Sequence, residues 1–184
     1  MNKIFLYLSA FIPLYCLLII KLLIEIINRN LTFNVLNTLT LIILLIFISL
    51  GCCGLYAENK KAKYQIKEIV ILQKESITQQ HFLGYFSLFV LFALTFQLEH
   101  WSMFIIFLII LVLIGIVYIK NDLFYINPLL NILGYNFYDI TYKDSNGDQK
   151  VSKFFYKGKI ETNQKYIIKI GDKNFNYIYK NRKE

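Results

Sequence analysis

The feature that most constrains this chain is a series of four long apolar stretches without a charged side chain, at residues 4–20, 35–57, 82–98 and 102–119. An α-helix rises about 1.5 Å per residue, so stretches of this length approach the roughly 30 Å hydrocarbon thickness of a bilayer. Charged residues make up only 17% of the chain, against about 25% in soluble domains. The sequence therefore predicts a membrane α-helical protein with four transmembrane helices embedded in the lipid bilayer.

The first apolar stretch has a competing interpretation as a signal peptide. No A-x-A-like cleavage site follows it, so we expect it to remain in the mature protein. Pro13 lies inside the stretch and predicts a kink, because proline cannot donate the helical hydrogen bond. Lys21 and Glu25 follow one turn apart, where they can form an ion pair or extend toward the membrane interface.

Lysine and arginine are unevenly distributed among the segments that join the apolar stretches. Four alternating spans would place eighteen of these residues on one side of the membrane and one on the other, with Lys21 at a helix end. Basic residues concentrate on the cytoplasmic side of membrane proteins. We therefore expect both termini in the cytoplasm, and we attribute the net charge of +8 to this bias rather than to direct nucleic-acid binding.

The segment between the second and third apolar stretches has an ambiguous pattern. Residues 63–74 are rich in β-branched side chains, and Tyr64, Ile66, Val70 and Leu72 share one face at period two, which favours a strand. A helical stripe in the same residues would instead make an interfacial helix. Both interpretations place this segment on the cytoplasmic side.

The C-terminal tail changes to the pattern of a β domain. It carries four strand candidates separated by turn-forming sequences, at residues 135–143, 151–156, 166–170 and 175–179. Together with a strand from the inner loop, they predict a small five-stranded, barrel-like domain, because closure removes exposed strand edges. The expected domains are therefore a membrane domain at 1–122, with a cytoplasmic loop at 58–81, and a cytoplasmic β-rich domain at 123–184.

The start of the tail has the signature of a short capped helix. Asn127 can cap the helix, Pro128 suits its first position, and Gly134 stands where the helix end needs a positive φ. The helix should lie at the membrane surface, and Gly134 should turn the chain into the strand that begins at Tyr135. We expect these four residues to couple the tail rigidly to the last apolar stretch.

Few residues in this sequence could carry catalysis or bind a cofactor. Cys52, Cys53 and His81 could meet in space, but adjacent cysteines lack the spacer typical of zinc sites. The residues from Asp144 to Asp148 begin like a calcium loop but lack its glycine and its final glutamate, so a hairpin turn is favoured. We expect no enzymatic activity, no metal and no cofactor.

Three sequence segments carry a resemblance to a known family. They are QHFLGY at 80–85, YIKNDLFYINP at 118–128 and LGY at 133–135, in a chain with four apolar stretches and a β-rich tail. Together they resemble KwaA, the membrane subunit of the Kiwa anti-phage defence system. The resemblance implies a protein of the bacterial cytoplasmic membrane that forms homo-oligomers such as tetramers. It also implies that this subunit senses phage-caused disturbance of the envelope and works with a cytosolic DNA-binding partner.

Three functional hypotheses follow from these patterns. The first is a membrane sensor and scaffold that recruits or regulates a cytosolic effector protein, with Lys153, Lys157 and Lys159 as candidate docking residues. The alternative is an oligomeric channel or pore-forming effector, because four apolar helices with few polar residues can assemble around a hydrophobic gate. An enzyme acting on lipids through Glu99, His100 or His81 is the weakest of the three.

Overall fold

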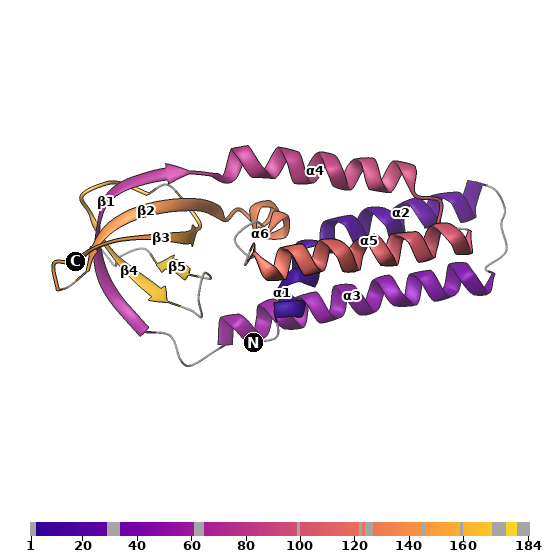
Figure 1. Cartoon of the computed structure of the whole chain (residues 1–184), viewed down its shortest axis with the longest axis horizontal. Coiled ribbons are helices and arrows are strands. Elements are labelled where there is room, and N and C mark those ends of the chain that lie inside the picture. Colours follow the sequence, from indigo (N-terminus) through magenta and orange to yellow (C-terminus); the bar gives the residue numbers. More distant parts are fainter. Residues whose placement is uncertain are drawn as a thin grey trace. The chain divides into compact units, whose positions relative to one another are not determined.

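A computed structural model of the chain describes residues 3–28, 34–60, 65–98, 100–121, 123, 127–144, 146–158, 160–170 and 176–179. The contacts divide the chain into two compact units. The first, which we call the helical unit, comprises Met1–Asn59 and Gly84–Leu123. The second, which we call the barrel unit, comprises Lys60–Leu83 and Phe124–Glu184. Figure 1 shows the order of helices and strands along the chain.

The helices of the helical unit are α1 (Lys3–Ala10), α2 (Ile12–Asn28), α3 (Val35–Lys60), α5 (Trp101–Lys120) and the part of α4 (Thr78–Thr95) that follows Leu83. The axes of α1 and α2 are bent by 51° at the break between them. The kink expected near Pro13 is therefore confirmed, and its cause is that proline has no N–H to donate to the carbonyl four residues earlier.

Two glycines allow α3 to approach the N-terminal helices closely. A Cβ atom added at Gly51 would lie 2.9 Å from the Cα of Ser9, and one added at Gly54 would lie 2.6 Å from the Cβ of Phe5. Real side chains do not tolerate these distances. Small residues that bring two backbones together are a common means of packing membrane helices, where water does not drive association.

The expectation of four transmembrane helices is wrong. Within the described residues, only Val35–Ala57 and Trp101–Lys120 are long and apolar enough to cross a membrane, and α1 with α2 would add a third only if the bent pair is one span. The third expected stretch contributes a short apolar helix over Phe86–Thr95. Its helix begins earlier, among polar residues, and ends at Thr95, so the apolar residues 96–98 do not extend it.

The barrel unit contains a closed barrel of five strands: β1 (Gln65–Ser76), β2 (Asn136–Asp144), β3 (Gln149–Tyr156), β4 (Lys165–Ile170) and β5 (Asn176–Tyr179). Their order around the barrel is β1-β2-β3-β5-β4, and only β3 and β5 are parallel. The strand interpretation of the inner loop is confirmed. This strand, β1, pairs with β4 through its first half and with β2 through its second half.

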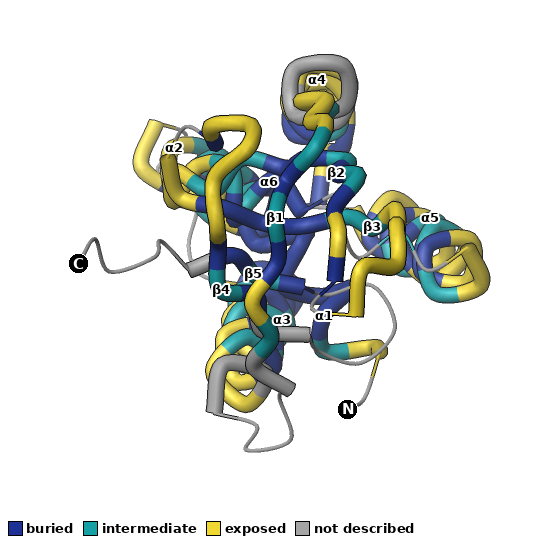
Figure 2. Tube along the Cα trace, turned by 90° about the vertical axis from the view of Figure 1, so that its left-hand side faces the viewer, coloured by how far each residue is buried: buried dark blue, intermediate teal, exposed yellow. Residues whose placement is uncertain are grey.

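The strands of the barrel contain buried stretches, drawn dark blue in Figure 2, and the buried cluster consists of branched aliphatic and aromatic side chains. The cluster consists of Ile69, Ile71, Tyr138, Ile140, Tyr142, Phe154, Tyr156, Ile160, Tyr166, Ile168 and Ile178. Two of its phenols make hydrogen bonds: Tyr138 donates to the carbonyl of Gly158 at 3.2 Å, and Tyr166 accepts from the N–H of Glu161 at 2.8 Å. A small barrel of this kind is a packed core and not a channel.

Asp144, at the β2–β3 turn, forms ion pairs with two lysines. The buried carboxylate of Asp144 accepts a hydrogen bond from Lys150 at 3.0 Å and lies 3.7 Å from the ammonium of Lys67. The backbone of Asp144 also bonds to Asp148 and Gly147, which closes the turn. The expected hairpin turn is therefore present, and the carboxylate that could have begun a calcium loop is engaged by two lysines.

We predict that Gly54→Ala destabilises the helical unit by about 1–3 kcal/mol, because the added methyl group would overlap Phe5. Thermal unfolding of the detergent-solubilised protein, followed by circular dichroism, measures the effect. Gly84→Ala in α4 is the matched control: among the described residues, its Cβ would meet nothing within 4 Å. Equal melting temperatures for Gly54→Ala and Gly84→Ala would contradict the close approach of α3 to α1.

We predict that the barrel loses stability at alkaline pH. Burial raises the pKa of Tyr138, Tyr142 and Tyr156 above the ordinary value of 10.0, and the hydrogen bond to Asp144 raises the pKa of Lys150 above 10.5. Each group holds its proton more tightly when folded. Its contribution is therefore complete below the unfolded pKa and is lost as the pH rises through the folded pKa.

An alkaline titration followed by phenolate absorbance should therefore show a cooperative rise that coincides with the loss of β-sheet circular dichroism. Tyr142→Phe should move this transition to higher pH, because it removes one phenol that must ionise on unfolding. Phenols that titrate smoothly while the sheet signal is unchanged would contradict this account of the core.

Candidate functional site

The helix α6 (Pro128–Ile132) has the capped geometry that its sequence predicts. The Oδ1 of Asn127 accepts hydrogen bonds from the N–H groups of Leu129 at 3.0 Å and Leu130 at 3.3 Å, and Pro128 occupies the first turn. Gly134 has a φ of +85°. Its N–H donates to Asn131, and the next N–H donates to Leu130, both at 2.9 Å. This pair of bonds is a Schellman motif, which leaves the end of α6 well defined.

The apolar side chains of α6 divide between two environments. Pro128 and Leu130 are buried, whereas Ile132 and Leu133 are about half exposed, at 54% and 51%. The two buried residues and the two half-exposed residues thus differ in environment, and α6 contacts β2. That the half-exposed residues contact lipid, and that α6 couples the tail to the membrane, stay predictions.

Tyr135 belongs to an aromatic group on the strands that follow α6. Its ring lies 6.2 Å from the ring of Tyr177, which in turn lies 5.7 Å from Phe155. Phe155 lies 4.8 Å from Phe137, and both are buried. We call Tyr135, Phe137, Phe155 and Tyr177 the aromatic cluster. It fixes the first strand of the tail directly after the turn at Gly134.

The three candidate docking lysines do not share one environment. The ammonium of Lys157 lies 5.9 Å from the centre of the Tyr135 ring, a cation–π distance. Lys153 is half-buried within β3, opposite Asp139 in the register of β2 and β3. Lys159 lies outside the described residues. The structure therefore associates Lys157 with the aromatic cluster.

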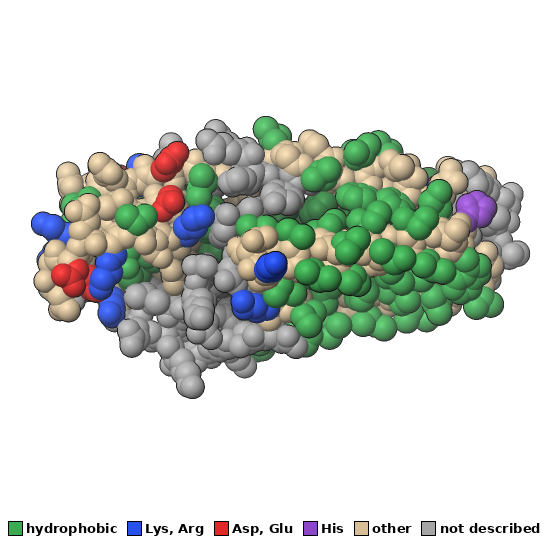
Figure 3. All heavy atoms as spheres, viewed as in Figure 1, with side chains coloured by type: hydrophobic (Ala, Val, Ile, Leu, Met, Phe, Trp, Pro, Cys, Tyr) green, Lys and Arg blue, Asp and Glu red, His purple; other side chains and the backbone are tan. Residues whose placement is uncertain are grey.

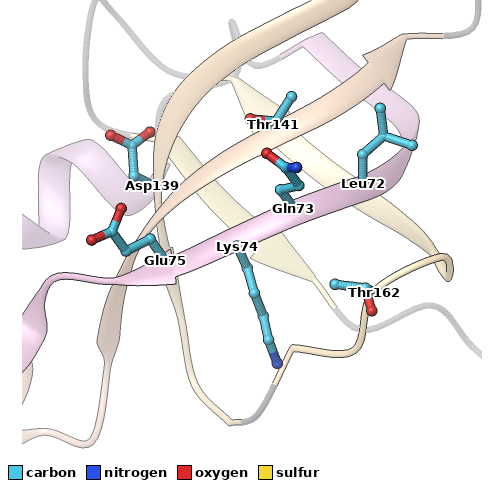
Figure 4. Close-up of a pocket in the computed structure, with 7 residues that line it drawn as sticks. All are labelled: Leu72, Gln73, Lys74, Glu75, Asp139, Thr141 and Thr162. Atoms are coloured by element: carbon cyan, nitrogen blue, oxygen red, sulfur yellow. The ribbon is translucent and has the colours of Figure 1, made fainter.

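A groove runs along β1 and β2 beside the segment before β4, and Figure 4 shows its lining. It encloses about 460 Å³ and is lined by Leu72, Gln73, Lys74, Glu75, Asp139, Thr141 and Thr162. The register of β1 against β2 shifts between Ile71 and Gln73, so Leu72 is an extra residue of the β-bulge type. Bulges redirect side chains and often lie beside functional sites.

Two carboxylates, those of Glu75 and Asp139, line the groove beside amide and hydroxyl groups that can donate or accept hydrogen bonds. Glu75 lies directly opposite Asp139, and Gln73 opposite Thr141, in the pairing of the two strands. The like charges of Glu75 and Asp139 would destabilise the pairing if no other group compensated them. The Oδ1 of Asp139 is buried and has no hydrogen-bond partner within the described part of the chain. Lys74 points away from the carboxylates and donates to the carbonyl of Ile160. The groove can therefore receive a hydrogen-bond donor or a cationic group.

The strand order also bears on where a ligand would bind. A closed barrel with the order β1-β2-β3-β5-β4, with β1 shared between β2 and β4, has the topology of OB-fold barrels. Such barrels bind oligonucleotides or oligosaccharides on the face of strands 2 and 3. This is an analogy of fold, and the ligand must be argued from side chains. The carboxylates of Glu75 and Asp139 disfavour a polyanion in the groove.

The helical unit exposes a continuous apolar surface. Figure 3 shows hydrophobic side chains gathered over the helices and most charged side chains over the strands. On α5 the exposed residues include Ile105, Ile106, Ile109, Val112, Leu113, Ile116 and Val117. An apolar surface of this extent indicates contact with a membrane or with another protein. Two apolar helices, α3 and α5, could span a membrane.

The candidate metal and acid–base residues of the sequence are only partly described by the structure. Cys16, Cys52 and Cys53 are free and exposed. The side chains of His81 and Glu99 lie outside those that the structure describes, and His100 is exposed. No group of three or more His, Cys, Asp or Glu side chains within the described residues could hold a metal ion.

A family model described as "Anti-phage protein KwaA" matches residues 2–179. The chain belongs to this family. The resemblance expected from the sequence is therefore confirmed, and membership in the KwaA family implies a function in anti-phage defence. Among curated proteins and among solved structures, no match to this KwaA family member was found.

We predict that Gly134→Val destabilises the junction between α6 and β2 in this KwaA family member. A β-branched residue is strained at a φ of +85°, at a cost of about 1–3 kcal/mol. Hydrogen exchange of the α6 and β2 amides should quicken while membrane insertion is unchanged. Gly134→Asn is the control, because asparagine tolerates positive φ. Equal exchange in the parent and the valine variant would refute a strained turn here.

Proposed function

We propose that the chain is a non-catalytic sensor and scaffold of anti-phage defence in the bacterial cytoplasmic membrane. In this proposal the helical unit is embedded in the bilayer and the barrel lies in the cytoplasm. The barrel recruits or regulates a soluble effector protein, and copies of the chain associate through their helices. The proposal assigns no nucleic-acid binding to the chain itself.

The observation that carries this proposal is that two helices, α4 and α5, lie between the paired strands β1 and β2 in the sequence. The barrel closes through pairing of β1, which precedes α4, with β2, which follows α5. Only Ile77 separates β1 from α4, and its N–H donates to the carbonyl of Phe137 on β2 at 3.1 Å. A displacement of α4 or α5 would therefore act on both strands of one ladder. Switching proteins transmit small shifts through packed elements that are connected in this way.

The membrane assignment is supported by the apolar surfaces of α3 and α5. In water the exposed aliphatic side chains on these helices would be a liability, whereas in lipid they are compatible with a monomer or an oligomer. The orientation is supported by the lysines of the barrel unit, because basic segments remain on the cytoplasmic side.

Partner docking is supported by the charge of the barrel surface. Exposed lysines include Lys143 on β2, Lys157 after β3 and Lys165 on β4. Such a surface favours association with an acidic protein surface and speeds the encounter. Lys157, which also contacts Tyr135, offers an aromatic and a cationic contact at one place.

We predict that a flexible Gly-Ser linker inserted after Asp122 abolishes phage protection while the barrel still folds. The linker relieves the mechanical connection between α5 and the tail but leaves the strand sequences intact. Efficiency of plating measures protection in cells that carry the variant and the wild-type defence partners. Each variant carries a C-terminal green fluorescent protein, which fluoresces only when it folds in the cytoplasm.

The control for this experiment is the same linker placed after Glu184, ahead of the fluorescent protein, where it should have no effect on protection. Protection by the Asp122 linker variant equal to that of the parent would refute coupling through this connection. Loss of fluorescence in the parent fusion would refute the cytoplasmic position of the barrel.

A further inference from the structure

Lys21 makes an unusual contact for a charged residue within an apolar helix. Its ammonium on α2 donates hydrogen bonds to two backbone carbonyls near the end of α4, those of Leu94 at 3.2 Å and Phe96 at 2.9 Å. Leu94 belongs to the last turn of α4, and Phe96 follows the helix end at Thr95. The last four carbonyls of a helix have no partner within the helix, and that end carries partial negative charge.

We propose that Lys21 is a positioning residue that caps α4 from a neighbouring helix and thereby holds the α4–α5 connection in place. A lysine in an apolar span usually extends toward the interface, so that its ammonium reaches water. Here the ammonium reaches backbone carbonyls of the same protein instead. Its side chain is only 23% exposed, and its neighbours Leu18 and Leu22 are almost fully buried.

The ion pair with Glu25 is secondary to this contact. The Oε1 of Glu25 lies 3.8 Å from the ammonium of Lys21, one turn along the same helix. Pairs of this spacing contribute little to stability. The carboxylate partly compensates the lysine charge. The two carbonyl contacts of Lys21 connect α2 to the end of α4, and they link residues 73 and 75 positions apart.

The residues held by Lys21 also join α4 to α5. The ring of Phe96 lies 5.3 Å from that of Phe92 on α4 and 5.9 Å from that of Phe107 on α5. Phe96 is 8% exposed and Leu98 is 3% exposed. The cap therefore fixes the backbone of an aromatic residue that packs against both helices, and it keeps the start of the connection buried.

The consequence for signalling rests on the proposed function. α4 continues from β1 after a single residue, so its N-terminal end is tied to the barrel by the chain and its C-terminal end is tied to α2 by Lys21. Release of the cap would free one end of a helix whose other end continues a barrel strand. A disturbance of the membrane that separates α2 from α4 would then be transmitted to β1.

The cap is tested by the reactivity of a cysteine placed in the connection. In the full chain in native membranes, with Cys16, Cys52 and Cys53 replaced by serine, Leu98→Cys is buried and should react slowly with a maleimide. Adding Lys21→Met removes the charged donor and should speed labelling by about tenfold or more. Gln97→Cys, at an exposed position, is the control and should react quickly in every background.

Three further variants separate a cap from general damage. Lys21→Arg keeps the charge and the donors and should label at nearly the parent rate. Lys21→Gln keeps one donor group, so its labelling rate should lie between those of the arginine and methionine variants. If Lys21→Met does not insert into the membrane, Lys21→Gln takes its place in the comparison. Glu25→Gln should change the rate less than twofold. Parent-like labelling in Lys21→Met and Lys21→Gln, or an equally large effect of Glu25→Gln, would overturn the proposal.

Phage protection is measured on the same lysine variants without the cysteine substitutions. Faster labelling together with altered protection supports both the cap and its part in signalling. Faster labelling with unchanged protection leaves the cap established and refutes its part in signalling. Failure of the sensor proposal itself is recognised separately, because the linker variant after Asp122 would then protect while the labelling results are unaffected.

Discussion

Closure of the barrel is the interaction on which the rest of the molecule depends, because β1 and β2 lie on opposite sides of α4 and α5 in the sequence. Without β1, both β2 and β4 would be left with an unpaired edge. Pairing across two intervening helices carries the entropic cost of a long loop unless those helices are already folded. Barrel closure and the folding of α4 and α5 are thus coupled, because folded helices shorten the loop that closure must span.

The sequence predicted the structure best where the structure depends only on residues adjacent in the chain. Asn127, Pro128 and Gly134 each act within one helix and its turn, so their roles could be predicted from residue type alone. The prediction of four spans was wrong because hydropathy records neither the break beside Pro13 nor the end of α4 at Thr95. The strand in the inner loop was predicted, but its period-two face containing Val70 and Leu72 is not the buried one. Ile69 and Ile71 face the core instead.

The two sites with the most distinctive chemistry could not be found by pattern. The sequence predicts for Lys21 only an ion pair with Glu25 or an extension toward the interface. It does not indicate the carbonyl partners, because these are backbone atoms of apolar residues far away in the sequence. The groove depends on a register shift at Leu72 that brings Glu75 opposite Asp139. Both sites exist only after tertiary contacts form, so no local signal in the sequence could indicate them.

The described residues of the barrel expose both lysines and carboxylates, and this mixture bears on the partner that we propose. Exposed lysines such as Lys143 and Lys165 favour an acidic surface, whereas the groove beside Glu75 and Asp139 favours a donor or a cation. A nucleic acid is negative along its whole backbone, so it would gain from the lysines and be repelled at the groove. A protein can match both signs at once, and such matched patterns give specificity more than affinity. The topology is that of oligonucleotide-binding barrels, whereas the protein partner that we propose rests on the side chains.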